Sequence, residues 1–362
     1  MKTVQYLSTP DKISRIYATD KLHISNTNDI ISPTTISFIT TNRCTAKCKN
    51  CCYGCSPIKA ERLSLEGMKK ILDDSFSAFP SLKLLVLTGG ECTLIGDDLL
   101  KIIKYATSRY KLKTRIVTNA FWGLSISTSF EVLKLLKAHG LTELNISTGD
   151  NHQKWVPYDA IVNTAIASQK LKIPTAISVE YSGTHIFSSQ ILKQDKRLTD
   201  YFNGKKGNLI ALDSIWMSSQ KRRETNPISG IVQNASSCKD LFKSISIAPN
   251  YDLLACCGLI SQKSPYLNIG NVKNDSIKKQ YEKQFSDFLK IWLYTEGPYA
   301  ILKFIHKIKG ERTDENALQT MHTCEICKNV LSAENIKILE ENYTHTYPSI
   351  MFKYLFKTKR QS

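Results

Sequence analysis

Short apolar runs alternate with amphipathic segments between residues 35 and 217. The segments between the runs carry apolar residues at helical spacing, as Leu65, Met68 and Leu72 do after Ser64, a residue suited to cap a helix. The apolar runs, rich in β-branched residues, predict strands at 36–40, 82–88, 114–118, 143–147, 175–181 and 211–217.

This rhythm predicts six βα units of about 30 residues each, joined by right-handed crossovers between parallel strands. A closed barrel of eight units needs about 250 residues, more than this region supplies. The fold class is therefore predicted to be α/β, with a partial (β/α)6 TIM-like barrel and a small C-terminal cysteine-rich α+β extension. A doubly wound open sheet has the same periodicity and is the alternative.

The rhythm ends at a polar, turn-rich segment that we interpret as a linker. Beyond it, a hairpin is predicted around the turn 249–252, and a helical stretch at 275–307 is interrupted at Gly297. The predicted organisation is an N-terminal extension (1–34), a barrel (35–217), a linker (218–237), a cysteine-rich domain (238–330) and a C-terminal helix with a basic tail (331–362).

The composition is that of a globular protein, with 42% hydrophobic and 22% charged residues among 362. The N-terminus has no apolar stretch of a secretion signal, and no run approaches the roughly 18 apolar residues of a membrane helix. We therefore expect a cytoplasmic protein with no membrane partner. The net charge of +17 favours acidic partners, but the lysines are scattered, as on a solvated surface. The basic tail, which includes Lys353 and Lys357, is interpreted as solvated.

Eleven cysteines are many for a reducing compartment, where disulfides do not persist. Cys92 stands apart and is interpreted as a small core residue. The other ten form two groups, one at positions 44, 48, 51, 52 and 55 and one at positions 238, 256, 257, 324 and 327. Cysteines grouped in this way predict metal or redox chemistry.

Cys44, Cys48 and Cys51 follow the first predicted strand with the spacing Cys-x3-Cys-x2-Cys. A loop after a barrel strand lies at the C-terminal face, where the active sites of such barrels are built. Three thiolates can hold three corners of a [4Fe–4S] cluster and leave the fourth iron open for another ligand. A zinc site made by Cys48, Cys51, Cys52 and Cys55 is the alternative.

The spacing and its place after the first strand resemble the signature of the radical S-adenosylmethionine (SAM) superfamily. The resemblance implies that Cys44, Cys48 and Cys51 bind a [4Fe–4S] cluster whose open iron chelates SAM. An electron then cleaves SAM to give a 5′-deoxyadenosyl radical. The family usually has an aromatic residue before the third cysteine, where this chain has Asn50. The resemblance covers residues 35–217.

Gly89, Gly90 and Glu91 end the second predicted strand and resemble the Gly-Gly-Glu motif of the same family. The resemblance implies that they bind the amino group of SAM. Glycines permit a close backbone approach, and a carboxylate accepts hydrogen bonds from an ammonium group.

Polar residues also follow the third and fourth predicted strands. Asn119 lies in a segment similar to the Thr-Asn-Gly of the family and is expected to fix loops by hydrogen bonds. Ser147 and Asp150 resemble a segment that contacts the ribose hydroxyls of SAM, although a strand-end turn explains them equally well. His152 and Glu180 could contact substrate or serve the packing of the barrel.

The second cysteine group supplies enough thiolates for a closed, four-ligand site. This layout resembles the C-terminal SPASM or twitch-like extension of radical SAM peptide and protein maturases, which holds an auxiliary cluster. That pattern has a glycine five residues before the second cysteine, where this chain has Tyr251. Zinc is the alternative metal. The implied ligands are Cys238, Cys256 or Cys257, Cys324 and Cys327.

Together these features predict a radical SAM maturase that cross-links, epimerises or forms a thioether in a peptide or protein, possessing an auxiliary [4Fe–4S] cluster. Its expected partners are the substrate, which could have an acidic leader peptide, and an electron donor such as flavodoxin or ferredoxin. One alternative is radical SAM chemistry on a small molecule or nucleotide. Another is a non-enzymatic zinc or iron–sulfur protein that binds nucleic acid, but no basic stripe with interleaved aromatic residues supports that partner.

Overall fold

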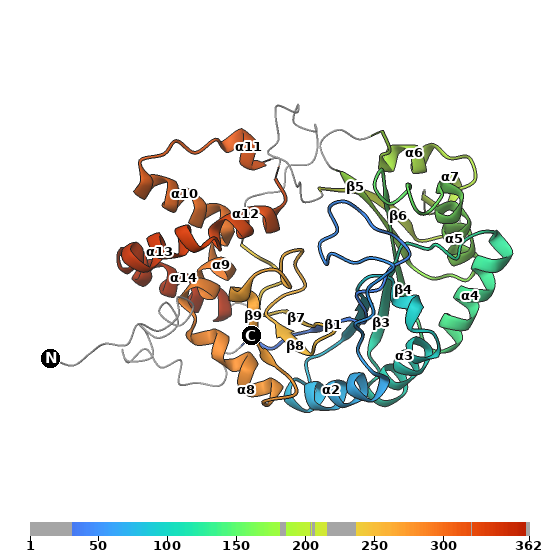
Figure 1. Cartoon of the computed structure of the whole chain (residues 1–362), viewed down its shortest axis with the longest axis horizontal. Coiled ribbons are helices and arrows are strands. Elements are labelled where there is room, and N and C mark those ends of the chain that lie inside the picture. Colours follow the sequence, from blue (N-terminus) through green and yellow to red (C-terminus); the bar gives the residue numbers. More distant parts are fainter. Residues whose placement is uncertain are drawn as a thin grey trace. The chain divides into compact units, whose positions relative to one another are not determined.

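The computed structural model describes residues 31–181, 186–202, 204, 207–215, 237–319 and 321–359 (Figure 1). The predicted linker, apart from Ser237, and most of the predicted N-terminal extension lie outside these residues. The chain divides into two compact units. The barrel unit takes its residues from Thr34–Asn226 and Ser246–Asp252, and the C-terminal unit takes them from Met1–Pro33, Pro227–Ile245 and Leu253–Ser362.

The barrel unit is built on six parallel strands that neighbour one another in chain order. They are β1 (Thr35–Ile39), β2 (Leu84–Thr88), β3 (Lys113–Thr118), β4 (Glu143–Gly149), β5 (Thr175–Tyr181) and β6 (Leu209–Ile215). A doubly wound sheet reverses its strand order at a switch point. This order runs in one direction from β1 to β6, so the prediction of an open, partial barrel is confirmed.

Helices connect the strands and lie on their outer side (Figure 1). They are α2 (Leu65–Ala78), α3 (Asp97–Tyr110), α4 (Ile126–Ala138), α5 (Tyr158–Lys170), α6 (Ser189–Gln194) and α7 (Thr199–Phe202). Ser64 caps α2 as expected, because its hydroxyl accepts a hydrogen bond from the N–H of Gly67 at 3.1 Å. Gly140 follows α4 with a φ of 114°, a conformation that favours glycine.

The two faces of the strands differ in burial. In β2, Leu85 and Leu87 are fully buried, whereas Leu84, Val86 and Thr88 are only half-buried. The apolar run of this strand does not alternate, yet its burial does, so one face of β2 is less covered than the other.

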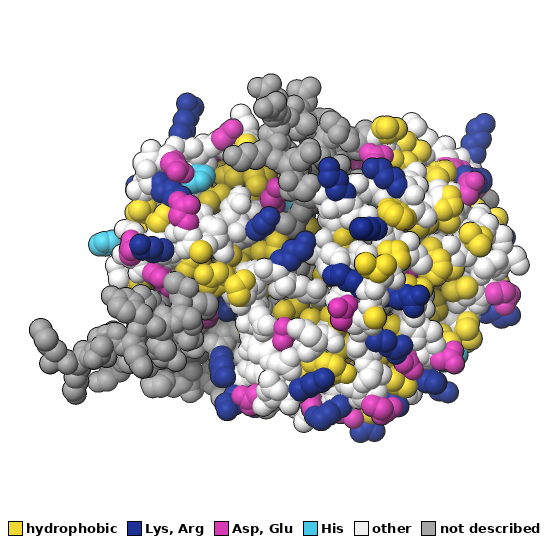
Figure 2. Space-filling model, viewed as in Figure 1, with side chains coloured by type: hydrophobic (Ala, Val, Ile, Leu, Met, Phe, Trp, Pro, Cys, Tyr) yellow, Lys and Arg dark blue, Asp and Glu magenta, His cyan; other side chains and the backbone are white. Residues whose placement is uncertain are grey.

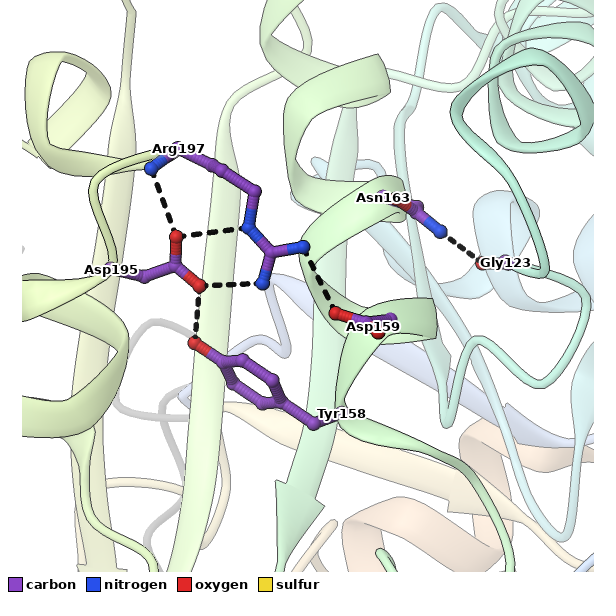
Figure 3. Close-up of polar contacts among 6 residues, drawn as sticks. All are labelled: Gly123, Tyr158, Asp159, Asn163, Asp195 and Arg197. Carbon is purple, nitrogen blue, oxygen red and sulfur yellow. Dashed lines mark hydrogen bonds and ion pairs between the residues drawn. The ribbon is translucent and has the colours of Figure 1, made fainter.

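A polar network joins the start of α5 to the segment between α6 and α7 (Figure 3). The Tyr158 hydroxyl donates a hydrogen bond to Asp195 at 2.8 Å, and the Arg197 guanidinium donates to Asp195 at 2.7 and 3.0 Å. Arg197 also reaches Asp159 at 2.9 Å. These bonds lower the pKa of Asp195 to about 2, with those from Arg197 contributing most.

The C-terminal unit is mainly helical. Its helices are α8 (Ile277–Glu282), α9 (Phe288–Thr295), α10 (Gly297–Lys309), α11 (Glu315–Gln319), α12 (Thr323–Val330), α13 (Ala333–Asn342) and α14 (Tyr347–Lys359). Gly297 begins α10, so the predicted interruption is confirmed. The predicted hairpin is formed by β7 (Ser244–Ile247) and β8 (Asp252–Leu254), and its residues 246–252 belong to the barrel unit. Strand β9 (Asn268–Asn271) was not predicted.

The tail predicted to be solvated folds as α14. This helix packs against α9 through aromatic contacts, and the rings of Tyr294 and Tyr354 meet edge to face at 6.1 Å. Both rings are buried.

On the face shown in Figure 2, lysine and arginine side chains are dispersed among acidic and apolar ones. None of the helices formed by the described residues has the length and apolar character needed to cross a membrane.

Candidate functional site

The loop that carries the first cysteine group joins β1 to α2 and closes on itself by backbone hydrogen bonds. The N–H of Leu63 donates to the carbonyl of Thr40 at 2.9 Å, and the N–H of Cys44 donates to that of Ser56 at 3.1 Å. The loop, drawn in blue, crosses the strand ends (Figure 1). It therefore lies at the C-terminal edge of the sheet, where barrel enzymes hold their active sites.

Gly89 and Gly90, directly after β2, are the residues against which this loop packs. The N–H of Gly90 donates to the carbonyl of Thr41 at 2.7 Å, and that of Glu91 donates to the carbonyl of Arg43 at 2.9 Å. A Cβ on Gly90 would lie 2.0 Å from the Arg43 oxygen, and one on Gly89 would lie 2.6 Å from the Thr41 oxygen. In this structure the two glycines thus permit close approach of the cysteine loop itself.

Cys44 is buried beside the end of β3. The side-chain amide of Asn119 donates to the Cys44 Sγ at 3.7 Å and to the Thr45 hydroxyl at 3.0 Å. The Asn119 oxygen accepts a hydrogen bond from the N–H of Phe121 at 3.1 Å, which fixes the orientation of the amide. Asn119 therefore ties the cysteine loop to β3, in agreement with the expectation that it fixes loops.

Cys48 lies beside the ends of β4 and β5. Its Sγ is 3.8 Å from the carbonyl oxygen of Asn151. The next residue, His152, has its N–H 3.0 Å and its Nδ1 3.1 Å from the two carboxylate oxygens of Glu180. Glu180 packs against Gly149, where a Cβ would lie 2.0 Å from the Glu180 Cγ. His152 and Glu180 are both buried, so in this structure they brace the strand ends that face Cys48.

The thiols of the first group lie close enough to influence one another. The pKa of Cys44 is raised to about 11 and that of Cys48 to about 12, mainly by burial and in part by the charge of Cys51. Hydrogen bonds from the thiols of Cys52 and Cys55 lower the pKa of Cys51. Cys44 and Cys48 are therefore neutral near pH 7 without a metal, and metal binding must release their protons.

Glu91 is fully buried and its carboxylate is surrounded by donors. It accepts hydrogen bonds from the Thr93 N–H and hydroxyl, from the Thr118 hydroxyl and from the Asn119 N–H, at 2.7 to 3.2 Å. Burial raises its pKa, and these bonds act in the opposite direction. The side chain joins the ends of β2 and β3, a structural role that the motif resemblance did not indicate.

Ser147 and Asp150 occupy different settings at the end of β4. Ser147 is half-buried and pairs across the sheet with Ser178 of β5. The Asp150 carboxylate accepts hydrogen bonds from the N–H groups of Ile186 and Phe187 at 2.9 and 3.0 Å. In this structure Asp150 holds the segment that precedes α6.

The described residues contain no tight group of three His, Cys, Asp or Glu side chains of the kind that surrounds a single metal ion. The ligands of a cubane cluster each bind a different iron and stand further apart. Three neighbouring thiols on one loop, with Asn119 donating to Cys44, suit such a cluster because its ligands are thiolates stabilised by hydrogen bonds.

The second cysteine group comes together within the C-terminal unit. Cys324 and Cys327 lie three residues apart near the start of α12, so they share one face of the helix. The ring of His322 caps this helix, because its Nδ1 accepts a hydrogen bond from the Cys324 N–H at 3.0 Å. Burial raises the pKa of Cys324 to about 12 and also raises that of Cys327.

Cys238, Cys256 and Cys257 complete this group. Burial is the main cause of the raised pKa of each, and each is also raised by the charges of other cysteines in the group or of Asp240. A Cβ on Gly258 would lie 3.3 Å from the Cys256 Sγ and 3.1 Å from that of Cys324, so these two sulfurs flank the same backbone position. A hydrogen bond with the Ser244 side chain lowers the pKa of Cys257 against this effect.

Cys92, the isolated cysteine, is fully buried and its Sγ is 3.4 Å from the Val117 carbonyl oxygen. This burial fits the interpretation of Cys92 as a core residue.

The sequence analysis did not identify His322 as a residue of the second cysteine group. Its position two residues before Cys324 was the signal that could have identified it.

No protein-family model matches the chain. The chain is 22% identical over 340 residues to YydG of Bacillus subtilis (strain 168), whose name assigns it to peptide biosynthesis. That alignment covers 89% of this chain and 98% of YydG. Polyhistidine-tagged anSMEcpe with bound AdoMet matches with a TM-score of 0.51 at 12% identity, over 89% of this chain and 99% of that chain. BtrN in complex with AdoMet and 2-DOIA gives a TM-score of 0.45 at 12% identity, over 74% and 89%.

The similarity to anSMEcpe shows the fold. The chain therefore shares its fold with a protein that binds AdoMet. The alignment with anSMEcpe extends over most of the chain and is not confined to the barrel unit.

Proposed function

We propose that this protein is a radical SAM enzyme that modifies a peptide or protein. Cys44, Cys48 and Cys51 are the ligands of its catalytic [4Fe–4S] cluster. The observation that carries this proposal is the loop with these three cysteines, seated on the strand ends of a partial barrel whose fold is that of an AdoMet-bound enzyme. When bound, the cluster supplies the electron that cleaves SAM to a 5′-deoxyadenosyl radical.

The surrounding residues keep the three thiols in place. Gly90 lets the loop approach β2, and Asn119 donates a hydrogen bond to Cys44. The braced pair of His152 and Glu180 holds the strand ends beside Cys48. Ser147, Asp150 and the motif Gly89, Gly90 and Glu91 remain the proposed SAM-binding residues. The Glu91 carboxylate is already hydrogen-bonded, so this residue would contribute by holding its neighbours in position.

The second cysteine group is proposed to hold an auxiliary [4Fe–4S] cluster. Its ligands are Cys238, Cys256, Cys324 and Cys327. We choose Cys256 over Cys257 because its sulfur and that of Cys324 flank Gly258, whereas Cys257 is engaged with Ser244. The proposed organisation keeps the barrel at 35–217 and the auxiliary domain at 238–330.

A peptide substrate is supported by the similarity to YydG along nearly its whole length, because that protein is named for peptide biosynthesis. The net charge of +17 suits an acidic leader peptide. A flavodoxin or ferredoxin would supply electrons, and the compartment would be the cytoplasm.

The test measures 5′-deoxyadenosine formed by anaerobically reconstituted protein with dithionite and SAM. The control is the triple variant Cys44→Ala, Cys48→Ala and Cys51→Ala, with iron and zinc determined on both proteins. We expect the product from the wild type alone and residual iron on the variant. An iron-loaded, folded wild type that forms no 5′-deoxyadenosine would refute the proposal, and zinc in place of iron would favour a binding protein.

A further inference from the structure

Helix α14 carries lysines that the sequence analysis assigned to a solvated tail. The ammonium of Lys357 instead donates hydrogen bonds to the Ser237 hydroxyl at 2.8 Å and to the Tyr294 carbonyl oxygen at 2.7 Å. It also lies 4.2 Å from the centroid of the Tyr294 ring, within the range of a cation–π interaction. The side chain is half-buried, and burial lowers the pKa of its ammonium.

These contacts place the ammonium next to the first cysteine of the second group. Ser237 directly precedes Cys238, and the Cys238 N–H donates to the carbonyl of Leu293 at 3.1 Å. Leu293 and Tyr294 are consecutive residues near the C-terminal end of α9. Cys238 and Lys357 thus bind neighbouring carbonyl groups of the same helix.

We infer that Lys357 is a positioning residue of the auxiliary centre, which holds Ser237 and Cys238 against the end of α9 and supplies a fixed positive charge beside a thiolate ligand. The inference rests on the proposed function, because it takes Cys238 as a ligand of an auxiliary iron–sulfur cluster. The basic helix α14 is then part of that centre.

The helix is suited to this role because it packs against α9. Tyr354, one turn before Lys357, is fully buried against Tyr294. The other nearby charges are Asp240, which raises the pKa of Cys238, and Lys243, which lowers that of Lys357. Reduction adds negative charge to a thiolate-ligated cluster, so a fixed cation beside it favours the reduced state.

The first test is a redox titration of the full chain, followed by electron paramagnetic resonance. The parent protein for this test has Cys44, Cys48 and Cys51 replaced by alanine, so that the resonance signal comes from the auxiliary cluster alone. We expect Lys357→Met to make reduction about tenfold less favourable, a shift of about 59 mV to more negative potential for a one-electron couple. Lys357→Arg retains the charge and should stay near the parent value.

Lys353→Met is the matched control. It removes the same charge from the same helix, but the Lys353 ammonium pairs with Glu296 at 2.6 Å and is exposed. Its potential should equal that of the parent. A Lys357→Met protein with full iron content and the parent potential would overturn the electrostatic role of Lys357.

The second test needs no cluster. Hydrogen exchange of the cluster-free, full-length protein reports whether the Cys238 N–H stays bound to Leu293. We expect Lys357→Met to speed exchange of that amide about tenfold, the effect of losing about 1.4 kcal/mol of hydrogen bonding, and Lys353→Met to leave it unchanged. Exchange at the parent rate in Lys357→Met would overturn the positioning role. Absence of auxiliary iron would refute only the proposed cluster, because the exchange result stands by itself.

Discussion

Replacing Gly90 with alanine should push the cysteine loop away from the end of β2. The new Cβ would lie 2.0 Å from the Arg43 carbonyl oxygen, whereas ordinary contacts begin at 3.4 Å. The loop must therefore retreat by about 1.4 Å at the residue before Cys44, well beyond the roughly 0.5 Å that a preorganised site tolerates. We expect the variant to lose about 1–3 kcal/mol of unfolding free energy through overpacking and to lose the barrel cluster.

The assay compares iron content and 5′-deoxyadenosine formation with those of the triple cysteine variant. Gly90→Ala should fall to the level of that variant. Gly96→Ala is the control, because a Cβ there meets nothing within 4 Å although Gly96 has a φ of 62°. Because Gly96 combines this φ with a ψ of −133°, the variant should lose about 1–3 kcal/mol of stability, and it should keep its iron. A Gly90→Ala protein with the iron content and activity of the wild type would refute the claim that the loop needs a glycine at this position.

Three further predictions concern single side chains. Asp195→Asn should lower the unfolding free energy by about 2 kcal/mol at pH 7, because Arg197 lowers the pKa of Asp195 from 3.8 to about 2; in urea titrations the difference should shrink as the pH falls from 3.8 toward 2, and a constant difference would contradict it. Asn119→Ala should make the potential of the barrel cluster more negative, because Cys44 loses a hydrogen-bond donor; an unchanged potential would show that this bond is not made in the loaded enzyme. Glu91→Gln should lower the unfolding free energy by about 1–3 kcal/mol, because an amide nitrogen would face the donors around this position; chemical denaturation at the wild-type midpoint would rule this out.

The sequence was most informative where local pattern determines structure. The predicted strand 175–181 coincides with β5, and Ser64 caps α2 as expected, because alternation and capping are properties of neighbouring residues. The spacing of Cys44, Cys48 and Cys51 likewise indicated one loop, and the structure packs the three residues into one cluster of that loop.

Contacts between distant segments could not be read in this way. Two of the four donors around Glu91 come from Thr118 and Asn119 at the end of β3, and Lys357 meets Ser237 across 120 positions of the chain. A lysine in a basic tail has the same local pattern whether it is solvated or inserted beside a cysteine. The half-covered inner face of β2 depends on the barrel being open, which no single strand reveals.

Two positions at which the resembled motifs have glycine hold other residues with a positive φ in this chain. Ala120 stands in place of the glycine of Thr-Asn-Gly, and Tyr251 stands in place of the glycine five residues before the second cysteine of the auxiliary pattern; their φ angles are 57° and 70°. Each conformation costs a non-glycine residue about 1–2 kcal/mol. At Tyr251 the cost is offset in part, because its hydroxyl lies 3.1 Å from the Ser64 hydroxyl and accepts a hydrogen bond from the Ser64 N–H at 3.3 Å. The tyrosine thus joins the hairpin turn to the cap of the helix that follows the cysteine loop, a contact that glycine could not make.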